Sequence, residues 1–99
     1  MPCRGGVPPL EGEALEKLAA QVPDWKILDG RKIWKSFPFP DFQTALDFTN
    51  RIGAVAEAEG HHPDIGLSWG RVDAVLDTHK INGLTESDFV MAAKIDRVV

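Results

Sequence analysis

The chain has little of what would tie it to an oxidising compartment or a membrane. Its one cysteine, Cys3, cannot form a disulfide within the chain and is compatible with a reducing cytosol. The N-terminus has no apolar signal-peptide core, and no later stretch approaches the roughly 20 apolar residues of a membrane-spanning helix. We therefore expect neither export nor membrane insertion, and a cytoplasmic location.

Positive charge is also scarce, since 11 lysines and arginines stand against 15 aspartates and glutamates. The formal net charge is -4, and no basic cluster exceeds two adjacent residues, as in Arg31-Lys32. Binding to nucleic acid rests largely on lysine and arginine side chains that neutralise phosphates. The composition therefore argues against a nucleic-acid partner.

What the chain does contain fits one small domain. With 99 residues, 43% of them hydrophobic, it has room for one core and not for two. Residues 1–9 are rich in glycine and proline and are expected to form an irregular tail, so that residues 10–99 make up the domain. Because so small a domain buries a modest share of its surface, we also expect a homodimer or tetramer.

Helical periodicity and capping residues predict three helices. The first covers residues 11–22 and stops at Pro23. The second follows the N-cap Asp41 and ends at Gly60, the natural C′ residue. The third opens with a variant capping box at residues 85–88, in which aspartate takes the place of glutamate.

Two β-hairpins lie between these helices. Strands at residues 25–28 and 33–37 flank the turn pair Asp29-Gly30. A two-residue turn there would mix apolar and charged residues on both faces, so a longer loop is favoured and the register stays open.

The second hairpin has a better-defined register. A two-residue turn at Trp69-Gly70 makes one face wholly apolar, through the pairs Leu67 with Val72, Ile65 with Ala74, and Pro63 with Leu76. The element order αββαββα then predicts an α+β fold, a four-stranded antiparallel sheet with helices packed on one face. The open polar face of the second hairpin is left for chemistry.

All three histidines, His61, His62 and His79, flank this hairpin. In the predicted register His62 lies across from Asp77, and His79 is its diagonal neighbour at ~7 to 8 Å between Cα atoms. Pro63 disfavours helical geometry at His62, so that the two adjacent rings project differently. Because histidine exchanges protons near neutral pH, the cluster predicts an acid–base site.

The stretch from Glu57 to Asp88 resembles the pterin-4a-carbinolamine dehydratase family. The signature residues, all at the family's spacing, are Glu57, His61-His62-Pro63, Trp69, His79 and Asp88. The resemblance covers nearly the whole chain, including the element order. It implies the dehydration of 4a-hydroxytetrahydropterin, a product of aromatic amino-acid hydroxylases, to the quinonoid dihydropterin in tetrahydrobiopterin recycling. It also implies that no metal or organic cofactor takes part.

That reaction needs an acid to protonate the departing 4a-hydroxyl group and a base to take the N5 proton. We expect His61 and His79 to form the acid–base pair and His62 to bind and polarise the pterin. Asp77 is expected to fix the tautomer of His62. The predicted catalytic and substrate-binding residues are Gly60, His61, His62, Pro63, Asp77, Thr78 and His79.

Three further signature residues each have a plainer explanation. Glu57 is expected to be a solvated helix residue, and Trp69 a packing residue beside the turn rather than a ring that stacks on pterin. Asp88 is as well explained as a helix cap as by a role in the site.

Two alternatives stay open. Three histidines could bind one zinc ion, although the usual short-spaced helical pair is absent. A non-catalytic dimerisation or assembly module is the stronger alternative, because proteins of this fold also serve as a transcription cofactor and as assembly factors for a carbon-fixing enzyme. The complete set of histidines favours the enzyme.

Overall fold

The computed structural model describes residues 8–99, so the prediction for residues 1–7, Cys3 included, lies outside the described part of the chain. The predicted order and the α+β class are confirmed. The elements are α1 (Gly12–Ala19), β1 (Lys26–Leu28), β2 (Lys32–Pro38), α2 (Phe42–Glu59), β3 (Asp64–Ser68), β4 (Arg71–Leu76), the 3-10 turn η1 (His79–Ile81) and α3 (Glu86–Arg97). Of the helices described over residues 8–99, none is long and apolar enough to cross a membrane.

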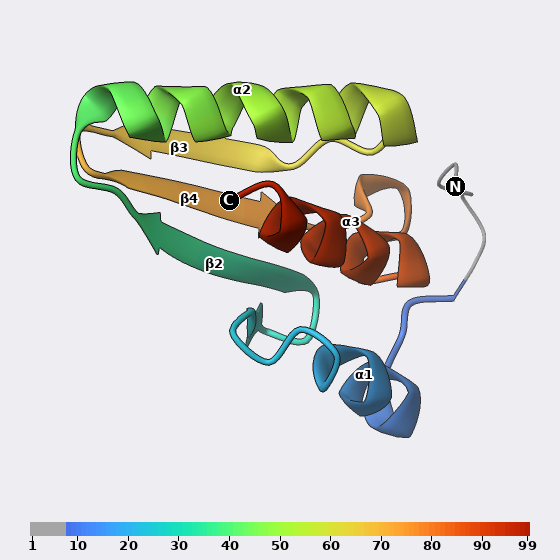
Figure 1. Cartoon of the computed structure of the whole chain (residues 1–99). Helices are drawn as coiled ribbons and strands as arrows, with labels where there is room; N and C mark the ends of the chain where they lie inside the picture. Colours follow the sequence, from blue (N-terminus) through green and yellow to red (C-terminus); the bar gives the residue numbers. More distant parts are fainter. Residues whose placement is uncertain (1–7) are drawn as a thin grey trace.

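The four strands form one antiparallel sheet in the order β1-β2-β4-β3. Figure 1 shows α2 running along β3, with α3 lying beside β4. Alternate residues of the central strands, among them Ile33, Val72 and Leu76, are fully buried against the helices. Their neighbours Trp34 and Val75 lie on the other face and stay partly exposed. The helices therefore cover one face of the sheet, as predicted.

Helix α2 carries its apolar residues at helical spacing, and Phe48 is their centre. The Phe48 ring is fully buried, with its centroid 4.8 Å from that of Phe37 and 5.1 Å from that of Phe39. Truncating such a ring to alanine typically costs about 3 to 5 kcal/mol. This contact holds α2 against the sheet and so fixes where its C-terminal end emerges.

Both hairpins agree with the hydrophobic pattern. In the first, Ile27 pairs with Ile33 and Leu28 with Lys32, which confirms a loop longer than two residues. In the second, the predicted pairs of Leu67 with Val72 and of Ile65 with Ala74 are confirmed. The ladder ends at Asp64 and Val75, so the predicted pair of Pro63 with Leu76 is not part of it, and proline has no N–H to extend it.

The first helix is shorter than predicted, because α1 ends at Ala19 rather than at Val22. The amides of Gln21 and Val22 donate to carbonyls only three residues back, which is a tighter turn than the α-helix makes. This turn brings Val22 and Trp25 into the core. The Trp25 indole N–H donates to the Asp96 carboxylate on α3 and so ties the segment to the last helix.

The capping predictions are confirmed at both ends of α2. The Asp41 carboxylate accepts from the Thr44 amide at 2.8 Å and from the Thr44 hydroxyl at 2.9 Å, and these bonds lower the pKa of Asp41. Gly60 ends the helix in the left-handed region, at φ 65 and ψ 28, which glycine adopts without steric cost. The chain therefore leaves α2 abruptly, and the histidine pair follows at once.

Candidate functional site

The histidines meet at the end of the sheet where α2 stops, β3 begins and β4 ends. A pocket of about 200 Å³ lies there, lined by Gly60, His61, His62, Asp77, Thr78, His79 and Lys80. It therefore brings together every predicted substrate-binding residue except Pro63. So small a pocket suits a compact ring system better than a large ligand.

His61 is the buried histidine of the group, with 6% of its side chain exposed. Its Nε2 lies 2.6 Å from Oδ1 of Asp88, which is completely buried at the start of α3. Because a carboxylate only accepts hydrogen bonds, Nε2 carries the proton, and Nδ1 is the basic nitrogen of the neutral ring. Asp88 thus sets both the orientation and the tautomer of His61.

The Asp88 carboxylate also organises the chain around His61. Its Oδ2 accepts from the Thr78 hydroxyl and from the Thr85 amide, both at 2.9 Å. Since the single Thr78 hydroxyl proton is used in this way, the Thr85 hydroxyl donates to Thr78 Oγ1 across 3.0 Å. The capping box at Thr85 is confirmed, and Asp88 is a helix cap and a neighbour of the pocket histidine at once.

His62 has a different partner from the predicted one. Its Nε2 lies 2.5 Å from Oε2 of Glu57, in the last turn of α2, and both side chains are largely exposed, at 61% and 78%. The predicted pairing of His62 with Asp77 is wrong. Glu57 is solvated, as expected, but it also holds the His62 ring.

Asp77 instead contacts His79, with 3.4 Å between Oδ1 and Nε2. The reason is that β4 ends at Leu76 and the chain turns into η1 at His79, so His79 does not continue the strand register that was expected of it. The turn brings the ring back beside the buried Asp77. Each of the three histidines therefore has a carboxylate at its Nε2, from Asp88, Glu57 and Asp77 respectively.

Thr78 lines the pocket, but its polar groups are already engaged. Its hydroxyl donates to Asp88, its amide donates to the Gly83 carbonyl, and its carbonyl accepts from the Ile81 amide. We therefore expect Thr78 to shape the pocket. Lys80 is a lining residue that the sequence analysis missed, and its position directly after His79 was the signal for it.

Trp69 lies away from the pocket. It sits in the turn between β3 and β4 and is 68% exposed, so it is not the packing residue that was expected. The five residues of β3, about 17 Å of extended chain, separate it from the histidine end of the hairpin. The structure does not bring Trp69 together with the other signature residues.

The three histidines do not form a metal-binding group. Within residues 8–99, the set of three or more ligand side chains close enough to share an ion is Asp64, Asp77 and His79. Of the histidines, only His79 belongs to it. This arrangement does not favour a zinc enzyme built on three histidines.

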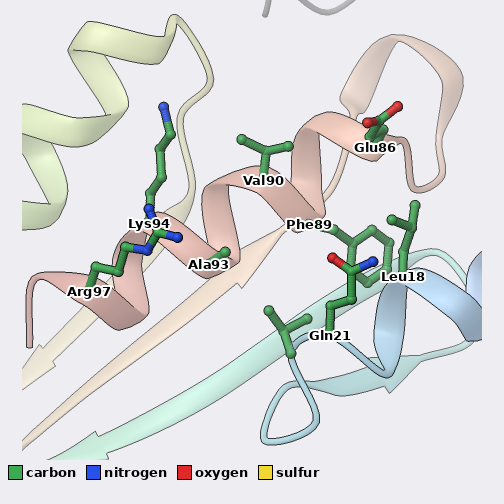
Figure 2. Close-up of a pocket in the computed structure, with 9 residues that line it drawn as sticks. Leu18, Gln21, Glu86, Phe89, Val90, Ala93, Lys94 and Arg97 are labelled. Carbon is green, nitrogen blue, oxygen red and sulfur yellow. The ribbon is translucent and has the colours of Figure 1, made fainter.

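A larger hollow, of about 440 Å³, lies between α1 and α3. In Figure 2 the Phe89 and Leu18 side chains face each other across it, with Lys94 and Arg97 toward one end and Glu86 toward the other. It contains no histidine, so it offers none of the acid–base chemistry of the smaller pocket.

Comparison with known proteins decides the family. The family model for Pterin 4 alpha carbinolamine dehydratase matches residues 8–98. The chain belongs to this family. The family prediction is thus confirmed, and with it the assignment to the dehydratases, which are hydro-lyases that eliminate water.

Several relatives of the pterin-4a-carbinolamine dehydratase family match over nearly their whole length. A Rubrobacter xylanophilus protein that carries the family's enzyme name is 57% identical over 98 residues, which is 99% of this chain and 92% of the relative. One from Methylococcus capsulatus is 52% identical over 98 residues, covering 98% and 86% respectively.

Solved structures agree with the fold. A transcriptional coactivator/pterin dehydratase from Brucella melitensis superposes with a TM-score of 0.84 at 36% identity, over 91% of this chain and 97% of that one. A pterin dehydratase-like protein identified as a RuBisCO assembly factor superposes with a TM-score of 0.65, over 76% and 88%. At 23% identity, the second likeness shows the fold alone.

Proposed function

We propose that this dehydratase converts 4a-hydroxytetrahydropterin to quinonoid dihydropterin and water by histidine acid–base catalysis, in tetrahydrobiopterin recycling. The observation that carries the proposal is one pocket lined by three histidines, each with a carboxylate at Nε2. The elimination breaks the C4a–O bond. One proton goes to the leaving hydroxyl group, which departs as water, and one is taken from N5, so charge and atoms balance.

His61 and His79 form the proposed acid–base pair, and they reach the pocket from different elements, since His61 follows α2 and His79 begins η1. His61 is held from behind by buried Asp88, whereas His79 is exposed and lies beside Asp77. A carboxylate beside an imidazole nitrogen holds the ring in one orientation. Asp88 and Asp77 are therefore positioning residues, because they act through the histidines.

His62 is the proposed pterin-binding histidine. Its exposure lets it reach a ligand at the mouth of the pocket, and Glu57 orients the ring from α2. Gly60 and Thr78 complete the proposed binding surface, whereas Pro63 lies outside the pocket lining and acts by restricting the backbone of His62. Trp69 has no part in this proposal within a single chain.

The deciding experiment is the rate of 4a-hydroxytetrahydropterin dehydration by the purified, metal-free protein, with His61→Ala and His79→Ala beside it. We expect each variant to lose roughly 100-fold or more in rate, the usual contribution of a positioned acid or base. Trp69→Ala, which is remote from the pocket, is the control and is expected to keep the rate. Because His61 is buried, its variant is first checked for a native circular dichroism spectrum.

An inactive wild-type protein would overturn the enzymatic proposal. The non-catalytic assembly module would then be the better account, as the shared fold of the RuBisCO assembly factor allows.

We further propose a cytoplasmic homodimer or tetramer that acts on the product of an aromatic amino-acid hydroxylase. Exposed Ile27 and Leu28 on the edge strand β1, together with Phe42 at the start of α2, support self-association. Light scattering after size-exclusion chromatography measures the mass directly. A mass of a single chain at micromolar concentration would refute the oligomer.

A further inference from the structure

A group of metal-ligating side chains lies at the edge of the proposed pterin pocket, where Asp77 and His79 line the pocket and Asp64 does not. Asp64, Asp77 and His79 each offer one ligand atom, and these three atoms all lie within 4.8 Å of one another. Asp64 pairs with Val75 in the sheet, and Asp77 follows two residues after Val75. Asp64 therefore lies on the same side of the sheet as Val75, the side that the helices leave open, and Asp77 follows directly after the end of β4.

The two carboxylates lack a strong cationic partner. In the part of the chain that the structure describes, no lysine or arginine pairs with either of them, and the contact of Asp77 with His79 Nε2 is 3.4 Å long. Only 7% of the Asp77 side chain is exposed, and no residue within 8–99 outside this group donates a hydrogen bond to its carboxylate, so a small contact with solvent is what its oxygens retain. Buried carboxylates are normally paired, hydrogen-bonded or metal-bound. Two close negative charges, one of them buried, favour a cation between them.

The donor set selects the class of ion. One imidazole nitrogen with two carboxylate oxygens suits zinc and neighbouring transition-metal ions, whereas magnesium and calcium prefer oxygen ligands alone. Three protein ligands leave a further position for water. We propose that Asp64, Asp77 and His79 bind a divalent transition-metal ion of the zinc class at this edge of the pocket.

The consequence for catalysis rests on the function proposed above. Coordination occupies a ring nitrogen of His79 and removes that nitrogen from proton transfer. The ion is therefore an inhibitor of dehydration and not a cofactor. Asp64 has no role in the proposed acid–base chemistry, which allows metal binding and catalysis to be separated by substitution.

Binding is tested without any activity measurement. The full chain is treated with EDTA, dialysed, and titrated with zinc chloride in a calorimeter, in parallel with Asp64→Asn and Asp73→Asn. Asp73 lies on the same open face, but its carboxylate pairs with Arg71 and is outside the group, so it is the matched control. We expect wild type and Asp73→Asn to bind zinc equally, and Asp64→Asn to bind at least about 10-fold more weakly, since even an indirect metal partner is worth that much. Absent binding, or equal binding by all three proteins, would overturn the site.

A second arm measures dehydration with and without zinc. We expect zinc to inhibit wild type and Asp73→Asn, while Asp64→Asn keeps the metal-free rate and needs at least about 10-fold more zinc for the same inhibition. Zinc binding that depends on Asp64 without inhibition would refute the inhibitory role. If metal-free wild type is inactive, the proposed function fails, but calorimetry still decides the metal site.

Discussion

Two carboxylate–histidine pairs in the same pocket differ in their surroundings and not in their length. His61 and Asp88 are 2.6 Å apart at 6% and 0% exposure, whereas His62 and Glu57 are 2.5 Å apart at 61% and 78%. An exposed ion pair is worth about 0 to 1 kcal/mol, because water and salt screen it. Removing one partner of a buried pair costs about 3 to 5 kcal/mol, because the other group is left buried without compensation.

The difference shows that separation alone does not rank interactions in this site. The buried pair joins the end of α2 to the start of α3 and is part of the architecture. The exposed pair lies within one stretch of chain and only orients a ring. Substitutions at Asp88, Thr78 and Glu57 test this contrast, and a helix cap remote from the pocket, Asp41, provides a smaller effect for comparison.

The largest effect is expected from Asp88→Ala. It leaves the His61 ring, the Thr78 hydroxyl and the Thr85 amide without their acceptor, so we expect a loss of about 3 kcal/mol or more in the free energy of unfolding. Urea denaturation measures it, with Glu57→Ala as the exposed counterpart at about 1 kcal/mol or less. Equal losses in the two variants would end the distinction between the pairs.

Thr78→Val refines the buried side of the comparison. It keeps the shape of the side chain but removes one donor to Asp88 and the acceptor of the Thr85 hydroxyl, which should cost about 1 to 2 kcal/mol. Thr49→Val is the matched control, because the Thr49 hydroxyl only bonds to the Ala45 carbonyl of its own helix. A Thr78 variant as stable as the Thr49 variant would show that the network around Asp88 contributes little.

Glu57→Gln refines the exposed side. The introduced amide would still reach His62 but without charge, so we expect KM for the pterin to rise up to about five-fold, equivalent to about 1 kcal/mol, with kcat and stability nearly unchanged. Steady-state kinetics separate the two constants. A fall in kcat as large as that of His79→Ala would instead make Glu57 part of the proton-transfer machinery.

The smallest effect concerns the N-cap of α2, remote from the pocket. The pKa of Asp41 is lowered by the Thr44 amide and hydroxyl, so its ionised form favours the folded chain above pH 3.8, and this contribution is lost as the pH falls further. Asp41→Ala should therefore lower the Tm at pH 7 but have less effect at pH 3. Asp41→Asn retains a cap acceptor and should fall between wild type and Asp41→Ala at pH 7. A Tm loss in Asp41→Ala that is independent of pH would contradict the role of ionised Asp41.

Local signals carried most of the fold prediction. Asp41, Gly60 and the capping box at Thr85 mark helix ends within a few residues of chain, and the second hairpin has one register that keeps a face apolar. The end of α1 was mispredicted, because periodicity continues to Val22 while the backbone already turns there to bury Trp25. Long-range packing overrode the local pattern at that point.

The site was predictable in its residues but not in its pairings. The clustering of every histidine around one hairpin, together with the family signature, named the residues that line the pocket. The partner of each ring could not be read in the same way. His61 meets Asp88 through the packing of the end of α2 against α3, and His62 meets Glu57, five residues before it, because the chain leaves α2 at Gly60. Asp77 contacts His79 and not His62, because β4 ends at Leu76.

The sequence by itself determined the family, the α+β order and the set of histidines, because these rest on spacing along the chain. Only the tertiary structure decided that His61 is buried on Asp88 across 27 residues, and that Asp64 lies close to Asp77 and His79. Burial and the distance between side chains arise when separate elements pack together. No local pattern of residues encodes them.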